Sequence, residues 1–155
     1  MAATGTALVL AAALLALVGT GPADAASRYK TVTRTFSNTT SIMIPSSGAA
    51  TPYPSEIPVG GLRSGKILSA NLTLVNFSHP WSDDVDVIVS HRNAHRTVMS
   101  DVGGDSYVSN ITLKLDDEAA SQLSYEGPLT GGTFKPANYG PPDDFSPCRR
   151  PPRTR

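Results

Sequence analysis

Carboxylate side chains gather at three places in the sequence where an alternating, strand-like pattern begins or ends. The three groups are Asp83, Asp84 and Asp86, then Asp101 and Asp105, then Asp116, Asp117 and Glu118. Calcium takes roughly six to eight oxygen ligands, and loops at one end of a β-sandwich can supply them from separate segments. We therefore predict a calcium site with Asp84, Asp86, Asp101 and Asp117 as candidate ligands. Because no EF-hand spacing is present and Asp commonly caps turns, the alternative is that these carboxylates only stabilise turns.

The histidines offer two further kinds of chemistry. His91 and His95 are four residues apart, a spacing that joins two zinc ligands only on a helix, whereas the Arg-Asn-Ala between them is typical of a turn. We therefore predict no zinc site there. Trp81, two residues after His79, can bury its indole ring while its N–H finds a hydrogen-bond partner. The alternative for Trp81 is stacking on a carbohydrate ring.

Proteolysis by the chain itself would need a nucleophilic serine, a histidine base and an orienting aspartate. The sequence contains neither a Gly-Thr-Ser-x-Ala segment nor a Gly-x-Ser-x-Gly elbow. Isolated Ser, His and Asp residues are too common to indicate a triad. We expect no catalytic residues in this chain and no enzymatic activity of its own.

The 155 residues carry 13 basic and 13 acidic side chains, but the two signs are distributed unevenly. Between Phe36 and Cys148 there are six basic and twelve acidic residues, so this part is acidic by six charges. The remaining basic residues lie toward the two ends. Because nucleic-acid binding depends on Lys and Arg contacts to phosphates, we expect no nucleic-acid partner. A single Cys excludes an internal disulfide framework.

The first 25 residues resemble an export signal. Residues 7–19 form an uncharged apolar run, followed by Ala23-Asp24-Ala25, which places small residues before a signal-peptidase cut. The run is short for a bilayer span, although an uncleaved anchor is the alternative. We predict a signal peptide over 1–25, a linker over 26–35, a secreted protein, and no membrane partner after cleavage.

Alternating apolar residues predict strands over residues 41–44, 68–75, 84–89, 97–99 and 111–116. Turn-forming clusters separate them, and only residues 117–123 could form a short helix. From Pro136 onward proline is frequent, so residues 136–155 are predicted to be loop and tail, with 141–155 a disordered Pro/Arg-rich tail. Short strands at regular spacing predict an all-β fold, an antiparallel sandwich or jelly roll.

Five segments, in a fixed order, resemble a known family. They are Ile42–Leu62, with Gly-Ala-Ala-Thr-Pro-Tyr-Pro-Ser inside it; Leu-Thr-Leu-Val-Asn-Phe-Ser-His-Pro-Trp-Ser-Asp-Asp-Val-Asp-Val (72–87); Met-Ser-Asp-Val-Gly-Gly (99–104); Asn-Ile-Thr-Leu-Lys-Leu-Asp-Asp-Glu-Ala (110–119); and Gly-Gly-Thr-Phe-Lys-Pro (131–136). Over residues 36–140 the chain resembles the P domain, or Homo B domain, of subtilisin-like proprotein convertases.

The resemblance implies an antiparallel jelly-roll β-sandwich of the galactose-binding-like kind. It also implies a non-catalytic role, since P domains accompany a subtilisin-like serine endopeptidase, stabilise it and tune its dependence on calcium and pH. The motif positions expected to be structural are Pro52, Tyr53, Pro54, His79, Trp81, Gly103 and Gly104. The competing hypothesis is a free-standing module of the same fold that binds carbohydrate or cell wall.

The family's closing motifs, among them Asn-Gly-x-Trp, do not occur after Pro136, so the sandwich is predicted to lack its last strands. A neighbouring strand would then have unpaired backbone groups. We expect the strand containing Ile111, Leu113 and Leu115, and the one containing Leu68, Leu72 and Leu74, to lose part of their cover. Marginal stability and self-association through the open sheet edge should follow.

Overall fold

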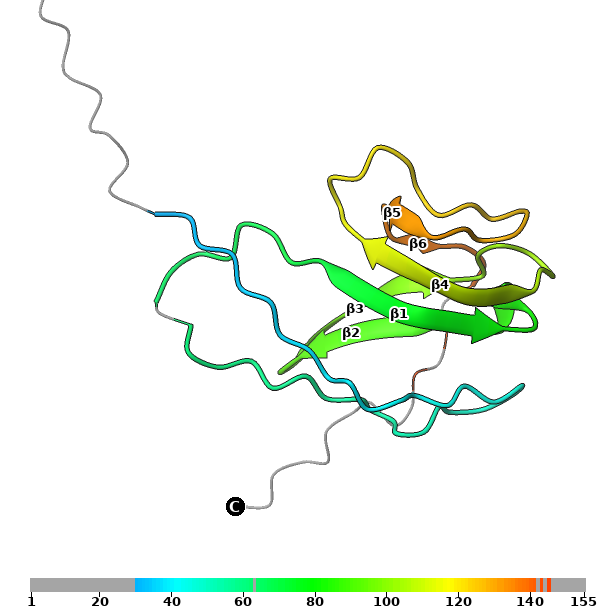
Figure 1. Ribbon diagram of the computed structural model, residues 1–155, viewed down its shortest axis with the longest axis horizontal. Helices are drawn as coiled ribbons and strands as arrows, with labels where there is room; N and C mark the ends of the chain where they lie inside the picture. The colour runs from blue at the N-terminus through cyan, green and yellow to red at the C-terminus, as the bar shows by residue number, and fades with distance from the viewer. Residues whose placement is uncertain (1–29, 63, 142, 144, 146–155) are drawn as a thin grey trace, which may run out of the picture. The chain divides into compact units, whose positions relative to one another are not determined.

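The computed structural model describes residues 30–62, 64–141, 143 and 145, and the described chain is almost entirely strand and loop. Figure 1 shows the elements in chain order. They are β1 (Leu72–His79), the short 3-10 helix η1 (Ser82–Asp84), β2 (Val87–His91), β3 (Ala94–Ser100), β4 (Val108–Leu115), β5 (Gly132–Phe134) and β6 (Ala137–Asn138). The predicted all-β class is confirmed.

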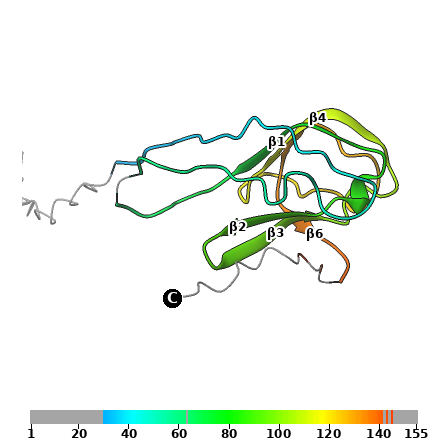
Figure 2. The ribbon, with the colours of Figure 1, turned by 90° about the horizontal axis from the view of Figure 1, so that it is seen from below.

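The strands form two sheets of three, in the orders β1-β4-β5 and β2-β3-β6. Figure 2 shows β1 and β4 in one layer and β2, β3 and β6 in another. The pairs β1–β4 and β2–β3 are antiparallel, but β4–β5 and β3–β6 are parallel. The prediction of a wholly antiparallel arrangement is therefore wrong. The two parallel pairs are made by β5 and β6, which are separated only by Lys135 and Pro136 and join different sheets.

A bulge in β1 explains how its buried side changes along the strand. Leu72 and Leu74 face the core before the bulge, whereas Phe77 and His79 do so after it. The register shifts between Leu74 and Phe77, and Asn76 takes a left-handed φ of 57°. Side chains alternate between the two faces of a strand, so one extra residue moves the following side chains to the opposite face. Asn adopts the left-handed conformation at the bulge more readily than most residues.

The core lies between the sheets and is built from both. Its fully buried side chains include Leu113 on β4 and Met99 on β3. Loops also contribute, because Val102, Leu123 and Leu129 are buried in the same cluster. The packing therefore extends well beyond the strands.

Several predicted elements differ from the structure. Residues 41–44 form only an isolated bridge, Met43 with Thr51, because no further partner pairs with them. The strand predicted over 68–75 begins at Leu72 and continues through the bulge to His79. Residues 117–123 form turns and bends, since the Asp116 carboxylate and carbonyl bind the backbone N–H groups of Glu118 and Ala119. Ala137–Asn138 is a strand where loop was predicted.

Of the residues expected to lose cover, Leu72 and Leu74 on β1 pack against the core, and Leu68, which precedes β1, is exposed. Leu113 and Leu115 on β4 are buried, because β4 pairs on both sides and is the central strand of its sheet. Ile67 and Leu68, immediately before β1, are 74% and 69% exposed. Within the described residues β1 is an outer strand whose partner in the sheet is β4 alone. The uncovered apolar surface therefore lies at β1 and the chain leading into it.

Contacts divide the chain between Thr35 and Phe36 into two units. In the first unit the described residues 30–35 are exposed and have no regular secondary structure. The predicted signal peptide, residues 26–29 of the predicted linker, and residues 142, 144 and 146–155 of the predicted tail lie outside the described residues. None of the described residues belongs to a helix with the length and apolar character of a bilayer span.

Replacing Gly103 with alanine should destabilise the domain by about 3 kcal/mol. Gly103 has a φ of +84°, and a Cβ there would overlap Ser82 Oγ and lie 2.7 Å from Leu129 Cγ. The measurement is the free energy of unfolding in denaturant. Gly61→Ala is the matched control, because Gly61 has a φ of +66° and open space around it, so only the backbone strain of about 1 kcal/mol remains. Equal losses in the two variants would contradict the packing argument.

Candidate functional site

The ends of two paired strands bring Asp86 and Asp101 together. Asp86 directly precedes β2 and Asp101 directly follows β3, and Val87 pairs with Met99 across this hairpin. The two carboxylates therefore lie at the same end of one antiparallel ladder. β6 adds a third, because its parallel pairing with Met99 and Ser100 returns the chain to this end before Asp143. One carboxylate oxygen from each of these three aspartates lies within 4.8 Å of the others.

Ser100 stands among these three carboxylates, which we call the aspartate cluster (Asp86, Asp101, Asp143). Its hydroxyl Oγ lies 2.9 Å from Asp101 Oδ2 and 2.9 Å from Asp143 Oδ2. A serine hydroxyl has one proton, so it can donate to only one carboxylate at a time. The Ser100 side chain is fully buried, which fixes the hydroxyl in place.

Gly140 lets the returning chain approach Asp101 closely. A Cβ at Gly140 would lie 2.8 Å from Asp101 Oδ2, and its φ of +76° is one that side-chain-bearing residues rarely adopt. The neighbouring Tyr139 donates its backbone N–H to the carbonyl of Ser100 at 3.3 Å. Backbone pairing and the absence of a side chain at Gly140 thus place Asp143 beside the hairpin.

The cluster raises the pKa of Asp86. Partial desolvation is the largest cause, even though the side chain reaches the surface, and the negative charges of Asp143, Asp101 and Asp84 act in the same direction. A hydrogen bond from Ser100 opposes them. The arrangement therefore favours either a proton on Asp86 or a cation among the carboxylates.

A cavity of about 180 Å³ adjoins the cluster and shares Asp101 with it. It is lined by Asp83, Asp101, Gly104, Asp105, Tyr125 and Glu126. Among the described residues, the buried Oδ1 of Asp83 has no hydrogen-bond partner. The loop positions in this wall are fixed by backbone bonds, such as Gly103 N–H to the Ser124 carbonyl at 2.9 Å. This end of the domain therefore presents a hollow rich in negative charge.

The predicted calcium ligands divide between separate places. Asp86 and Asp101 belong to the cluster, and Asp84 contributes negative charge to Asp86 without being a member. Asp117 is exposed in the turn after β4 and is also outside the cluster. Its neighbour Asp116 pairs with Lys114 at 2.9 Å and accepts from the Glu118 N–H at 3.0 Å. The third group of carboxylates thus contains a turn-capping Asp116, as the alternative interpretation held.

His79 and Trp81 connect β1 to the neighbouring loops, but differently from the prediction. His79 is 3% exposed, with Nδ1 2.5 Å from the Trp81 carbonyl oxygen and Nε2 3.4 Å from that of Pro45. The indole ring, predicted to be buried, is 47% exposed. The connection is therefore held by the imidazole and the backbone of Trp81, which leaves the indole on the surface.

The other predicted motif residues lie in turns. Pro52 and Tyr53 are partly buried just after the Met43–Thr51 bridge, and Pro54 is exposed. The Tyr53 hydroxyl lies 3.5 Å from the Phe145 carbonyl oxygen. Gly103 and Gly104 both have positive φ, and Gly104 lines the cavity.

Sequence reasoning missed Asp143. Proline frequency after residue 136 indicated a tail, whereas Ala137 is buried in the core and Tyr139 packs edge-on against Tyr125 at 5.2 Å. Phe134, Ala137 and Tyr139 are the apolar residues that could have extended the predicted fold to this point.

No family model, curated protein or solved structure matches this chain.

Replacing Asp86 with asparagine should stabilise the domain at neutral pH in the presence of a chelator. The folded-state pKa of Asp86 is raised, so the ionised carboxylate costs stability that returns as the pH falls through that pKa. The variant's advantage in unfolding free energy should shrink over this interval and vanish below the unfolded-state pKa of about 3.9.

Asp116→Asn is the control, because the pKa of Asp116 is shifted in the opposite direction to that of Asp86. The hydrogen bonds from Lys114 and from the Glu118 N–H lower the pKa of Asp116, so its contribution is present at neutral pH and is lost as the pH falls. Denaturant unfolding from pH 7 to pH 3 measures both. A stability difference between wild type and Asp86→Asn that does not change with pH would refute the electrostatic account.

Proposed function

We propose that this chain is a secreted, non-catalytic accessory domain that resembles a P domain and stabilises a subtilisin-like serine endopeptidase. The observation that carries the proposal is the uncovered apolar surface leading into the outer strand β1. Its exposed large side chains are Ile57, Val59, Leu62, Ile67, Leu68 and Val75. Several large apolar side chains left exposed along one stretch of chain support an interface with another protein. The resemblance of the five sequence motifs to a P domain supports a subtilisin-like endopeptidase as the partner.

The fold that we propose is a jelly-roll β-sandwich of the galactose-binding-like kind, opened at β1. Its two mixed sheets, and loops gathered at one end, are compatible with that architecture. The same open edge of β1 also offers a place for self-association when no partner is present.

The buried histidine supports an accessory role. Both ring nitrogens of His79 face backbone carbonyl oxygens, of Trp81 and of Pro45. A general base in acyl transfer would instead face a nucleophilic hydroxyl and an orienting carboxylate. His79 therefore connects β1 to the segment around Pro45.

We propose calcium as the cation of the aspartate cluster. Carboxylate oxygens are the ligands that Ca²⁺ prefers, and Asp86, Asp101 and Asp143 offer one each within a 4.8 Å span. Asp83 lines the adjoining cavity, and its buried Oδ1 has no hydrogen-bond partner among the described residues. A bound ion would link the β2–β3 hairpin to the chain after β6, at one end of the β2-β3-β6 sheet.

A carbohydrate-binding module is the second candidate. The exposed ring of Trp81 and the adjacent exposed Tyr107 favour it, because sugar rings stack on such aromatic faces. Oligosaccharides that quench Trp81 fluorescence at micromolar concentration would favour this candidate over the accessory role.

Calcium should raise the melting temperature of residues 26–155, and chelator should remove the effect. At about 100 times the dissociation constant the stabilisation is roughly 2.7 kcal/mol. Asp143→Asn should abolish the calcium-dependent shift, whereas Asp117→Asn, which alters a carboxylate outside the cluster, should preserve it. Calorimetry with calcium and with chelator measures both. Identical melting curves for the wild type in the two buffers would exclude the cation.

The accessory role is tested by the heat resistance of the subtilisin-like endopeptidase encoded nearest to this chain in its genome. Adding the mature chain should lengthen the half-life of protease activity about fivefold, equivalent to ~1 kcal/mol. The double variant Ile67→Ser, Leu68→Ser should lose this effect. Met43→Ser is the matched control, since Met43 is similarly exposed but lies elsewhere on the chain. Unchanged half-lives with the wild-type chain would refute the role.

A further inference from the structure

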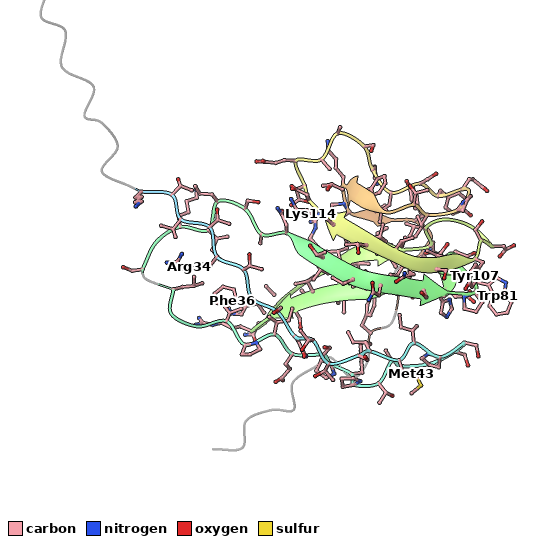
Figure 3. All side chains as sticks on the ribbon, in the orientation of Figure 1. Arg34, Phe36, Met43, Trp81, Tyr107 and Lys114 are labelled. Atoms are coloured by element: carbon pink, nitrogen blue, oxygen red, sulfur yellow. The ribbon has the colours of Figure 1, made fainter. Side chains whose placement is uncertain are left out.

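Two aromatic side chains lie exposed next to each other at the loop end of β1 and β4. Trp81 and Tyr107 are 47% and 67% exposed. The strand ladder places them together, because His79 pairs with Val108 and the Ser82 N–H binds the Ser106 carbonyl at 3.1 Å. Figure 3 shows both side chains at the same tip of the domain. Exposed Trp and Tyr held on paired backbone are the residues that most often anchor binding partners.

Each of the two aromatic residues has a carboxylate two positions away in the chain. Asp83 follows Trp81 by two residues and Asp105 precedes Tyr107 by two, and both line the cavity together with Asp101 and Glu126. Within the described residues the one ion pair, Lys114 with Asp116, lies at the end of β4 and outside this wall. An aromatic face beside unpaired carboxylates suits arginine, whose planar guanidinium stacks on the ring while its N–H groups bind the carboxylates.

The chain itself contains a segment of this chemistry. Residues 147–155 read Pro-Cys-Arg-Arg-Pro-Pro-Arg-Thr-Arg, with four arginines, three prolines and no acidic residue. Proline-rich segments lose little conformational entropy on binding and dock into aromatic-lined surfaces. The net charge of this segment is opposite to that of residues 36–148, which are acidic by six charges.

The distance along the chain allows the contact. The Asp143 carboxylate lies within 4.8 Å of the Asp101 carboxylate, and Asp101 also lines the cavity. Arg149 follows Asp143 by six residues, which span at most about 20 Å when extended. The first arginines can therefore reach the cavity from where Asp143 is held.

We propose that the surface formed by Trp81, Tyr107 and the cavity carboxylates binds the arginine-bearing segment 147–155 of the same chain. Arginine side chains stack on the two aromatic rings and bind Asp105 and Glu126, so the segment covers the aromatic pair. This interaction is independent of the calcium proposal, and its test is performed in chelator so that no metal ion occupies Asp101.

The fluorescence of Trp81, the only tryptophan, tests this proposal in the full mature chain. Acrylamide should quench it about twofold less strongly in the wild type than in the variant with Arg149, Arg150, Arg153 and Arg155 replaced by Gln, because the docked arginines shield the ring. A synthetic peptide of residues 146–155, added to that variant, should restore the protection. At about 1 M salt, where charges are screened beyond ~3 Å, the difference should largely disappear.

A second pair of variants tests the cavity side. Asp105→Asn with Glu126→Gln should raise quenching to the level of the arginine variant. Asp117→Asn with Glu118→Gln, which removes two carboxylates outside the cavity, should leave the protection intact. Circular dichroism melting verifies that all variants are folded. Equal quenching of the wild type and the arginine variant at low salt would overturn the proposal, as would full protection in the Asp105, Glu126 variant.

Discussion

The parallel pairing of β6 with β3 is the interaction on which the functional end of the domain depends. Met99 pairs with Ala137 and Ser100 with Asn138, and this short ladder closes a connection of more than thirty residues from the end of β3. The entropic cost of closing a loop grows only slowly with loop length. The two backbone pairs and the burial of Ala137 therefore hold the returning chain. Without them neither Asp143 nor the Tyr139–Tyr125 contact would be in place.

The β3–β6 pairing also brings like charges close together. It places Asp143 beside Asp86 and Asp101, whose mutual repulsion and partial desolvation raise the pKa of Asp86. A single Ser100 hydroxyl cannot satisfy all three carboxylates. Proteins commonly keep such local conflicts at binding sites, where a ligand removes the repulsion and the surrounding packing supplies the stability that the site lacks.

Sequence patterns predicted the parts of this domain in which neighbouring residues decide the structure. The alternation in β4 and the turn between β2 and β3 placed Asp86 and Asp101 near strand ends, because burial of one face is a local property. The bulge at Asn76, the parallel partners of β5 and β6, and the membership of Asp143 depend on residues distant in the chain, and no local period encodes them. The frequency of proline from Pro136 onward predicted loop, and this prediction is wrong for Ala137 and Asn138. These two residues are not prolines and pair with β3 between Pro136 and Pro141.

The domain thus divides its surface into two regions with different physical chemistry. Before β1 the exposed Ile67 and Leu68 present apolar area, whose burial stabilises by roughly 25 cal/mol per Å² and does not depend on charge. At the opposite, loop end, the carboxylates around Gly103 and Gly104 present negative charge, whose interactions weaken with ionic strength. The aspartate cluster lies at one end of the β2-β3-β6 sheet, so a cation bound there would hold the β2–β3 hairpin and the chain after β6 together within that sheet.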